Sequence, residues 1–291
     1  MNVVGTLPQM RDLSRRWHLA GETIALVPTM GALHAGHLAL VAAASRECTR
    51  VVVSIFVNPT QFGPTEDFSR YPRDLDGDLR ALSGLKVDAV FVPSAEGMYG
   101  PGFQTSVELA HLPRHLCGLT RTNHFGGVAL VVAKLFNVVR PDVAVFGLKD
   151  YQQVRVIEQM VADLDQDVRI LRHPTLREPD GLAMSSRNRY LSPADRATAP
   201  TLYATLQAIA GAVAGGATDA IRLAADGRAR LEAAGFVPEY LALCSPETLD
   251  EVVTIEGPVL VAVAARLGAT RLIDNLVAVP GGSPAAVSPA S

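Results

Sequence analysis

The sequence predicts an α/β fold: a Rossmann-like doubly wound parallel sheet followed by a smaller C-terminal α+β domain. Between about residues 23 and 172, short runs rich in Val, Ile and Phe alternate with helix-like stretches. Runs that are apolar throughout are typical of strands buried on both faces of a parallel sheet. Alternating strands and helices imply βαβ crossovers, and ligands of such sheets bind outside the carboxyl ends of the strands.

The elements of this first region are expected in a regular order. Strands are predicted at residues 23–27, 51–57, 89–92, 143–146 and 168–171. Helices are predicted between them at residues 37–47, 74–83, 127–139 and 151–163. Functional side chains are therefore expected just after the first four of these strands.

The pattern changes after Tyr190. Ser192, Pro193 and Asp195 occupy the N-cap, first position and first turn of a helix that we expect to run to about residue 214. A second helix near residues 219–234 and strands at 238–243 and 258–265 complete a smaller unit. We expect three parts: a Rossmann-like domain at residues 1–175, a C-terminal domain at 176–279 and a disordered tail at 280–291.

Composition excludes several classes of protein. Of the 291 residues, 48% are hydrophobic and 19% are charged, as in ordinary globular domains. The apolar runs are too short for a membrane span and the N-terminus does not resemble a signal peptide, so we expect a cytoplasmic protein. A net charge of -3 offers no basic field for nucleic acid. Three cysteines without CxxC spacing argue against a disulfide framework or a cysteine zinc site.

The segment PTMGALHAGH, residues 28–37, follows a predicted strand and opens a predicted helix. Backbone N–H groups and the helix dipole favour phosphate at such a position. His34 and His37 are three residues apart, so on a helical turn both rings face the same way and can donate to phosphate oxygens. The alternatives are an ordinary turn with solvent-facing histidines or half of a metal site. The strand–turn–helix context favours phosphate binding.

Three further segments place polar side chains where a ligand could bind. Asn58 and Gln61 follow the second strand and could hold hydroxyls or a carboxylate. Lys149 follows the fourth strand and suits a phosphate contact. The loop of residues 185–187, Ser-Ser-Arg, could clamp a phosphate near the domain boundary. Each segment taken alone also fits a plain turn, a solvated lysine or a polar loop.

Together these residues resemble the nucleotidyltransferase superfamily. HxGH stands at the position of its histidine motif, and Met184-Ser185-Ser186-Arg187 is similar to the KMSKS-type loop of class I aminoacyl-tRNA synthetases. The closer resemblance, over nearly the whole chain, is to the pantothenate synthetase (pantoate–β-alanine ligase) family. It is carried by these segments in order: PTMGALHAGH, SIFVNPTQF, YPRDLDGDL, HFGGV, KLFNVVRPDVAVFGLKDYQQ, DGLAMSSRNRYLSP and AARLGATRLIDN.

The resemblance implies ATP-dependent amide formation. In this family the carboxylate of pantoate attacks the α-phosphorus of ATP to give pantoyl-adenylate and pyrophosphate. The amine of β-alanine then attacks the adenylate, releasing AMP and pantothenate. Such a ligase needs positioning and charge stabilisation more than a protein nucleophile. The family also implies a homodimer, a first domain that binds nucleotide and pantoate, and a C-terminal domain that acts as a lid.

Site residues are carried over from the family by position. The resemblance makes His37 a proton donor and His34 a phosphate contact. Lys149 and Arg187 complete the expected catalytic set, and Gln61 and Gln153 are expected to hold pantoate. The ATP-binding residues it implies are Met30, Gly31, Ala32, Leu33, His34, Ala35, Gly36, His37, Gly147, Leu148, Lys149, Asp150, Leu176, Met184, Ser185, Ser186 and Arg187.

The chain departs from the family at three places. Leu148 stands where glutamate is common in the family, Thr122-Asn123 replaces a segment that contains proline, and Gly77 interrupts a run of acids that the resemblance associates with magnesium. Mg²⁺ is expected to arrive with ATP, held mainly by phosphates and water, and no protein ligand is assigned to it. The alternative functions are another HxGH nucleotidyltransferase, cytidylyl- or adenylyl-, or a non-catalytic nucleotide-binding protein.

Overall fold

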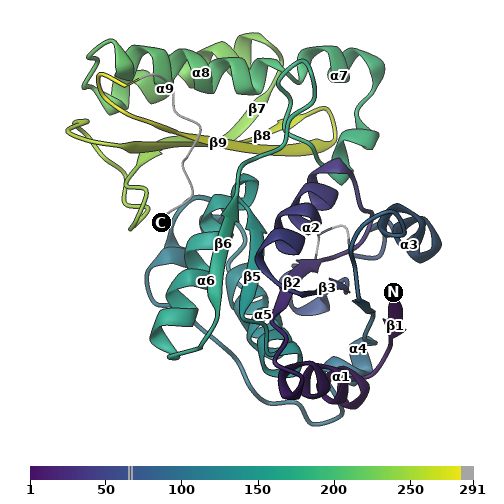
Figure 1. Cartoon of the computed structure of the whole chain (residues 1–291). Coiled ribbons are helices and arrows are strands. Elements are labelled where there is room, and N and C mark those ends of the chain that lie inside the picture. Colours follow the sequence, from purple (N-terminus) through teal and green to yellow (C-terminus); the bar gives the residue numbers. More distant parts are fainter. Residues whose placement is uncertain (65, 67, 283–291) are drawn as a thin grey trace. The chain divides into compact units, whose positions relative to one another are not determined.

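The computed structural model describes residues 1–64, 66 and 68–282. Over these residues the chain forms a six-stranded parallel sheet and a three-stranded antiparallel sheet (Figure 1). The α/β class predicted from the sequence is confirmed. The tail predicted at residues 280–291 falls mostly on 283–291, which lie outside the described residues.

The parallel sheet has the strand order β1-β4-β3-β2-β5-β6. Its strands are β1 (Asn2–Val4), β2 (Ile24–Thr29), β3 (Arg50–Ile55), β4 (Ala89–Phe91), β5 (Val143–Gly147) and β6 (Arg169–His173). The strand order runs outward in both directions from the β2–β5 pair, which makes this pair the switch point of a doubly wound sheet. Ligands of such sheets bind at the carboxyl ends of the strands beside that point.

Helices connect the strands of this sheet. They are α1 (Leu7–Leu19), α2 (Ala35–Glu47), α3 (Leu75–Leu82), α4 (Ala95–Met98), α5 (His124–Val139) and α6 (Tyr151–Asp163), with the short 3₁₀ turn η1 (Pro59–Gln61) after β3. Apolar side chains of α2 and α3 form one buried cluster with alternate strand residues, including Val27, Val53, Val90 and Val145. Right-handed crossovers place α1, α5 and α6 on the opposite face.

The second sheet is the antiparallel meander β7-β8-β9, formed by β7 (Val237–Cys244), β8 (Val259–Leu267) and β9 (Thr270–Ala278). Two helices, α8 (Thr201–Ala214) and α9 (Ala220–Ala233), pack together on this sheet (Figure 1). Leu202, Leu206, Leu231 and Val261 belong to the buried core between them. The single helix predicted from residue 192 to 214 is wrong: α7 (Pro193–Thr198) ends before Pro200, which lacks the N–H that a continuous helix needs.

By their contacts the described residues fall into two compact units. The first contains Met1–Ala110, Arg121–Gly147 and Gln153–His173, and the second contains His111–Thr120, Leu148–Gln152 and the chain from Pro174. This division differs from the continuous first domain expected at residues 1–175. The difference arises because the second unit includes two short segments that carry η2 (Leu112–Arg114), η3 (Leu116–Leu119) and η4 (Leu148–Asp150).

Most predicted elements of the parallel sheet are confirmed within a few residues. Strand β1, helix α1 and strand β9 have no counterpart among the elements predicted from the sequence. Helix α1 has a capping Thr6 and buried Met10, Leu13 and Trp17 at helical spacing, a signal that the sequence does carry. Strand β1 is only three residues long, and it exists because it pairs with β4, far away in the chain.

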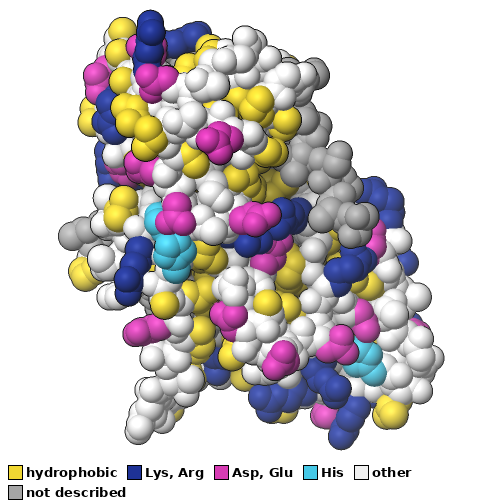
Figure 2. Space-filling view, turned by 90° about the vertical axis from the view of Figure 1, so that its left-hand side faces the viewer, with side chains coloured by type: hydrophobic (Ala, Val, Ile, Leu, Met, Phe, Trp, Pro, Cys, Tyr) yellow, Lys and Arg dark blue, Asp and Glu magenta, His cyan; other side chains and the backbone are white. Residues whose placement is uncertain are grey.

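No helix among the described residues has both the length and the apolar character needed to cross a bilayer. The three cysteines, Cys48, Cys117 and Cys244, are all buried free thiols. On the face drawn in Figure 2, Lys and Arg side chains and Asp and Glu side chains are scattered in small groups, several of which contain both signs of charge.

Gly127 of α5 lies against η1. A Cβ at this position would lie 2.3 Å from the carbonyl oxygen of Thr60 and 2.7 Å from the backbone nitrogen of Gln61. Backbone atoms cannot move aside as the end of a flexible side chain can. The contact between α5 and η1 therefore requires glycine here.

We expect Gly127→Ala to lower the free energy of unfolding by about 2–3 kcal/mol, because α5 and η1 must move apart. Gly211→Ala is the matched control, since Gly211 is an exposed residue inside α8 with nothing within 4 Å of a Cβ. That change should raise stability by about 0.5–1 kcal/mol through helix propensity. Urea unfolding followed by circular dichroism measures the free energy of unfolding of both variants. Equal changes in Gly127→Ala and Gly211→Ala would contradict the close approach of α5 and η1.

Candidate functional site

The turn after β2 is held by a buried carboxylate. Asp78 of α3 accepts hydrogen bonds from the backbone N–H groups of Ala32 at 3.0 Å and Leu33 at 2.7 Å. Ala32 has a left-handed backbone with φ 52°, and Gly31 has φ 78°. A Cβ on Gly31 would lie 2.8 Å from Asp78 Oδ2, so the turn needs glycine both for its conformation and for the close approach of the carboxylate.

This turn leads directly into the N-terminus of α2, which is capped by histidine. His34 Nδ1 accepts from the backbone N–H of Gly36 at 3.1 Å, and His37 Nδ1 accepts from the backbone N–H of His34 at 3.2 Å. The two rings lie with their centroids 4.1 Å apart. Because both Nδ1 atoms accept, each neutral ring carries its proton on Nε2. The predicted pairing of the two rings is confirmed, and it provides two N–H donors at a helix N-terminus.

A buried amide network follows β3. Asn58 donates through Nδ2 to Gln61 Oε1 at 3.0 Å and to the carbonyl of Gly127 at 3.1 Å. Its Oδ1 accepts from the hydroxyl of Tyr99 at 2.8 Å. Gln61 Nε2 lies 3.1 Å from Met30 Sδ, so the network reaches the turn after β2. Both residues were expected to contact a ligand. The structure shows that Asn58 orients the side chain of Gln61 through their hydrogen bond.

Arg121 forms a two-bond ion pair with Glu66, at 2.7 and 2.6 Å. Burial raises the pKa of Glu66, but the hydrogen bonds and charge of Arg121 outweigh it and leave that pKa below its ordinary value. Arg121 also contacts His124, whose Nδ1 lies 2.9 Å from the carbonyl oxygen of Gln61. The loop that contains Thr122 and Asn123 is thus tied to the segment after β3.

Lys149 lies in η4, directly after β5, as the sequence predicted. Asn275 of β9 donates its amide to the carbonyl oxygens of Leu148 and Lys149, both at 2.9 Å. The side chain of Asn275 therefore holds the backbone of the Leu148–Lys149 segment through hydrogen bonds that do not involve the Leu148 side chain. Asp150 at the end of η4 is exposed.

The loop with Met184–Arg187 is anchored by contacts before it and at its centre. Before it, Arg177 forms two hydrogen bonds with the buried carboxylate of Asp274, at 2.6 and 3.0 Å, and stacks over the ring of Tyr203 at 3.4 Å. Burial raises the pKa of Asp274, and Arg177 opposes that rise. At its centre Ser185 caps η5 (Ser186–Tyr190) by accepting from the N–H of Arg187 at 3.2 Å.

The predicted site residues fall into two groups. In the first unit, the turn of residues 30–37 and Gln61 come together through Met30. Gly147 ends β5 in the same unit, and Gln153 is a half-buried residue of α6 there. In the second unit, Leu176 and Met184 are joined by a backbone hydrogen bond of 3.0 Å, and the loop to Arg187 follows.

Sequence reasoning missed the residues that support these segments. Asp78 belongs to the run of acids that Gly77 interrupts, and both of its oxygens accept backbone N–H groups. Asp274 and Asn275 lie in the motif AARLGATRLIDN, to which the sequence assigns no role. A polar Asp-Asn pair flanked by Leu-Ile and Leu-Val in one strand is a signal that could have found them.

The fold and the turn before α2 define a class: a Rossmann-like α/β protein with a histidine-capped helix N-terminus, a position that favours anions, at the carboxyl edge of its sheet. The family model described as pantoate-beta-alanine ligase matches residues 2–277. The pantothenate synthetase of Desulfatibacillum aliphaticivorans is 51% identical over 281 residues, which are 96% of this chain and 100% of that protein.

Solved structures agree with this match. The pantothenate synthetase of Thermus thermophilus has a TM-score of 0.90 at 46% identity, covering 95% of this chain and 99% of its own. The pantoate-beta-alanine ligase of Francisella tularensis, in a complex with beta-gamma ATP and beta-alanine, has a TM-score of 0.81 at 32% identity, covering 98% of this chain and 100% of its own. The chain belongs to the pantoate-beta-alanine ligase family.

We expect Asp78→Asn to loosen the turn after β2, because an asparagine offers one oxygen where two backbone N–H groups now donate to a carboxylate. The loss should be about 2–3 kcal/mol in the free energy of unfolding, with weaker ATP binding. Asp76→Asn, an exposed neighbour on the same helix, is the control and should change neither. Urea unfolding and calorimetric titration with ATP test this; unchanged ATP affinity in Asp78→Asn would show that the turn does not depend on the carboxylate.

Proposed function

We propose that this protein condenses pantoate with β-alanine in two steps at the expense of ATP. Pantoate is first converted to pantoyl-adenylate with release of pyrophosphate, and β-alanine then displaces AMP to give pantothenate. Family membership over residues 2–277 supports the overall reaction. The single structural observation that carries the proposal is the histidine-capped N-terminus of α2 at the carboxyl edge of the sheet.

In this proposal His34 and His37 donate Nε2–H groups to the phosphates of ATP. Both Nδ1 atoms accept backbone N–H groups, which supports neutral rings that act through hydrogen bonds. Such donors stabilise the charge that grows on pyrophosphate as it leaves, together with the N-terminus of α2. His37 would thus act mainly by stabilising charge, and the transfer of a proton would be secondary.

Lys149 and Arg187 supply the cationic charge in the proposed mechanism. Lys149 would reach the phosphates from η4, whose backbone Asn275 holds. Arg187, with the hydroxyls of Ser185 and Ser186, would bind the triphosphate from the loop that Arg177 anchors. The remaining ATP-binding residues carried over from the family line the nucleotide through backbone and apolar contacts.

Gln61 and Gln153 are the proposed pantoate ligands. The hydrogen bond from Asn58 fixes the carboxamide of Gln61 with its oxygen toward Asn58. One N–H of the Gln61 NH₂ group faces Met30 Sδ, and the second N–H is a donor that suits a carboxylate or hydroxyl of pantoate.

The remaining features rest on the family resemblance. We propose that Mg²⁺ enters with ATP and is held by phosphate oxygens and water, because Asp78, the buried acid near the turn, already accepts two backbone N–H groups. We also propose a homodimer in the cytoplasm, with residues 1–175 as the nucleotide- and pantoate-binding domain and residues 176–279 as a lid.

The reaction is tested with purified protein and ATP. Pyrophosphate should appear only when pantoate is added, and AMP and pantothenate only when β-alanine is added as well. Pyrophosphate release that depends on a phosphorylated alcohol in place of pantoate would favour another HxGH nucleotidyltransferase. No release with either substrate would favour a non-catalytic nucleotide-binding protein.

We expect His37→Ala and Lys149→Ala each to slow adenylate formation on the order of 10²–10³-fold, since each removes a donor to the departing pyrophosphate. Supplied pantoyl-adenylate should restore most of the activity with β-alanine. His18→Ala and Lys86→Ala, which remove the same side chains elsewhere in the chain, should leave the rate unchanged. Single-turnover formation of adenylate is the measurement, and a loss below tenfold in both site variants would contradict the assignment.

We expect Gln61→Ala to weaken pantoate binding roughly tenfold or more, because a hydrogen bond to a charged group is lost. ATP binding should be nearly unchanged. Gln159→Ala removes an exposed glutamine of α6 and serves as the control. Calorimetric titration of each ligand measures both affinities; an equal loss for pantoate and ATP would show that Gln61 only supports the fold.

A further inference from the structure

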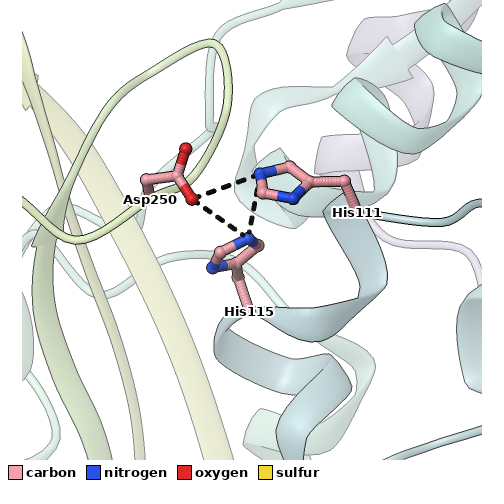
Figure 3. Close-up of side chains that lie close together, drawn as sticks. All are labelled: His111, His115 and Asp250. Carbon is pink, nitrogen blue, oxygen red and sulfur yellow. Dashed lines mark hydrogen bonds and ion pairs between the residues drawn. The ribbon is translucent and has the colours of Figure 1, made fainter.

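The second unit contains a cluster of two histidines and one aspartate, His111, His115 and Asp250 (Figure 3). His111 and His115 stand at the two ends of η2, so their rings lie on the same side of one helical turn. Asp250 comes from the loop that follows β7. Their ligand atoms form a closed triangle: 3.3 Å between the two Nε2 atoms, and 3.2 and 3.6 Å from these to Asp250 Oδ1.

Hydrogen bonds can satisfy only part of this triangle. A carboxylate only accepts hydrogen bonds, and each Nε2 carries at most one proton. If both Nε2 atoms are protonated, both donate to one oxygen of Asp250 and the contact between the two nitrogens carries no hydrogen bond; if either is not, its lone pair lies beside that oxygen. One cation bound to all three atoms would satisfy them together.

The triangle has the dimensions of a zinc site. Zn²⁺ binds histidine nitrogen and carboxylate oxygen at about 2.0–2.2 Å in tetrahedral geometry, which places neighbouring ligand atoms roughly 3.3–3.6 Å apart. All three distances lie within about 0.1 Å of that range. The side chains of His111 and Asp250 are each about half exposed, at 55% and 54%, so solvent can supply a fourth ligand.

Both ligand-bearing segments are held by the start of α6. The buried side chain of Gln152 donates to the carbonyls of Leu112 and His115, at 2.9 and 2.7 Å, and accepts from the N–H of Cys117 at 3.0 Å. The adjacent Tyr151 donates its hydroxyl to the carbonyl of Pro246 at 3.0 Å, in the loop that carries Asp250. A site whose ligand segments are fixed in this way loses little entropy when metal binds.

Two leucines with left-handed backbone lie beside the same residues. Leu116 follows His115 with φ 46°, and Leu249 precedes Asp250 with φ 66°. Leucine rarely adopts this left-handed conformation, which costs about 1–3 kcal/mol, and both side chains are buried. Packing of the two side chains thus holds the backbone next to His115 and Asp250 in a conformation that leucine rarely adopts.

We propose that His111, His115 and Asp250 form a binding site for one Zn²⁺ ion, with solvent as the fourth ligand. The ion would link η2 to the loop after β7 and stabilise the second unit. The site includes none of the residues assigned to ATP or pantoate. The zinc proposal can therefore be tested independently of the proposed ligase reaction.

The test uses the tag-free full-length protein and Zn²⁺ in competition with a chromophoric chelator. Wild type should bind one equivalent that His111→Ala/His115→Ala does not bind. Asp250→Asn, which keeps the shape of the side chain, should bind Zn²⁺ at least 10–100-fold more weakly. His34 and His37 are unchanged in every protein compared, so any metal that they bind is counted equally. His18→Ala and Asp226→Asn are the controls and should bind as wild type does.

A second measurement reports the geometry and does not depend on the histidine variant folding. Co²⁺ added to wild type should give the strong visible absorption of a tetrahedral site, and Asp250→Asn should lose it. One equivalent of Zn²⁺ should also raise the melting temperature of wild type and not that of Asp250→Asn. Equal Zn²⁺ stoichiometry and affinity in wild type and Asp250→Asn, or a weak octahedral Co²⁺ spectrum in wild type, would overturn the proposal.

Discussion

The turn that begins α2 depends on one carboxylate, that of Asp78. This carboxylate accepts hydrogen bonds from the N–H groups of Ala32 and Leu33. Both residues lie beyond the end of β2, so the sheet does not supply their hydrogen-bond partners. These charge-assisted bonds offset the cost of the left-handed conformation of Ala32. Asp78 comes from α3, which follows the neighbouring strand β3, so the crossover after one strand fixes the turn after the other. The direction in which α2 presents its N-terminus is set by this contact.

A comparable arrangement in the second unit comes from two adjacent residues of β9. Successive side chains of a strand point to opposite faces, so Asp274 and Asn275 can reach two different segments. Asp274 pairs with Arg177 before the Ser-Ser-Arg loop, and Asn275 holds the backbone of Lys149. Burial raises the pKa of Asp274, and without Arg177 its charge would be buried unpaired. One strand thus supports both cation-bearing segments of this unit.

The chain also uses two histidine pairs in contrasting ways. His34 and His37, three residues apart, direct Nδ1 to the backbone of their own turn. His111 and His115, four residues apart, instead bring both Nε2 atoms together with a carboxylate from a distant loop. The spacing alone does not distinguish the two cases. The difference lies in what each Nδ1 and Nε2 contacts, and Asp250 is 135 positions away from His115 in the sequence.

The sequence by itself determined the α/β class, most strands of the parallel sheet and the HxGH turn, because these follow from local hydrophobic periodicity and from contiguous motifs. It also indicated the family. Only the tertiary structure decided that β1 pairs with β4, that Asp78 holds the histidine turn, and that His111 and His115 meet Asp250. These contacts join residues that are far apart in the chain, and their side chains carry no local pattern. Which partner a buried polar group finds is decided by packing, when the whole chain has folded.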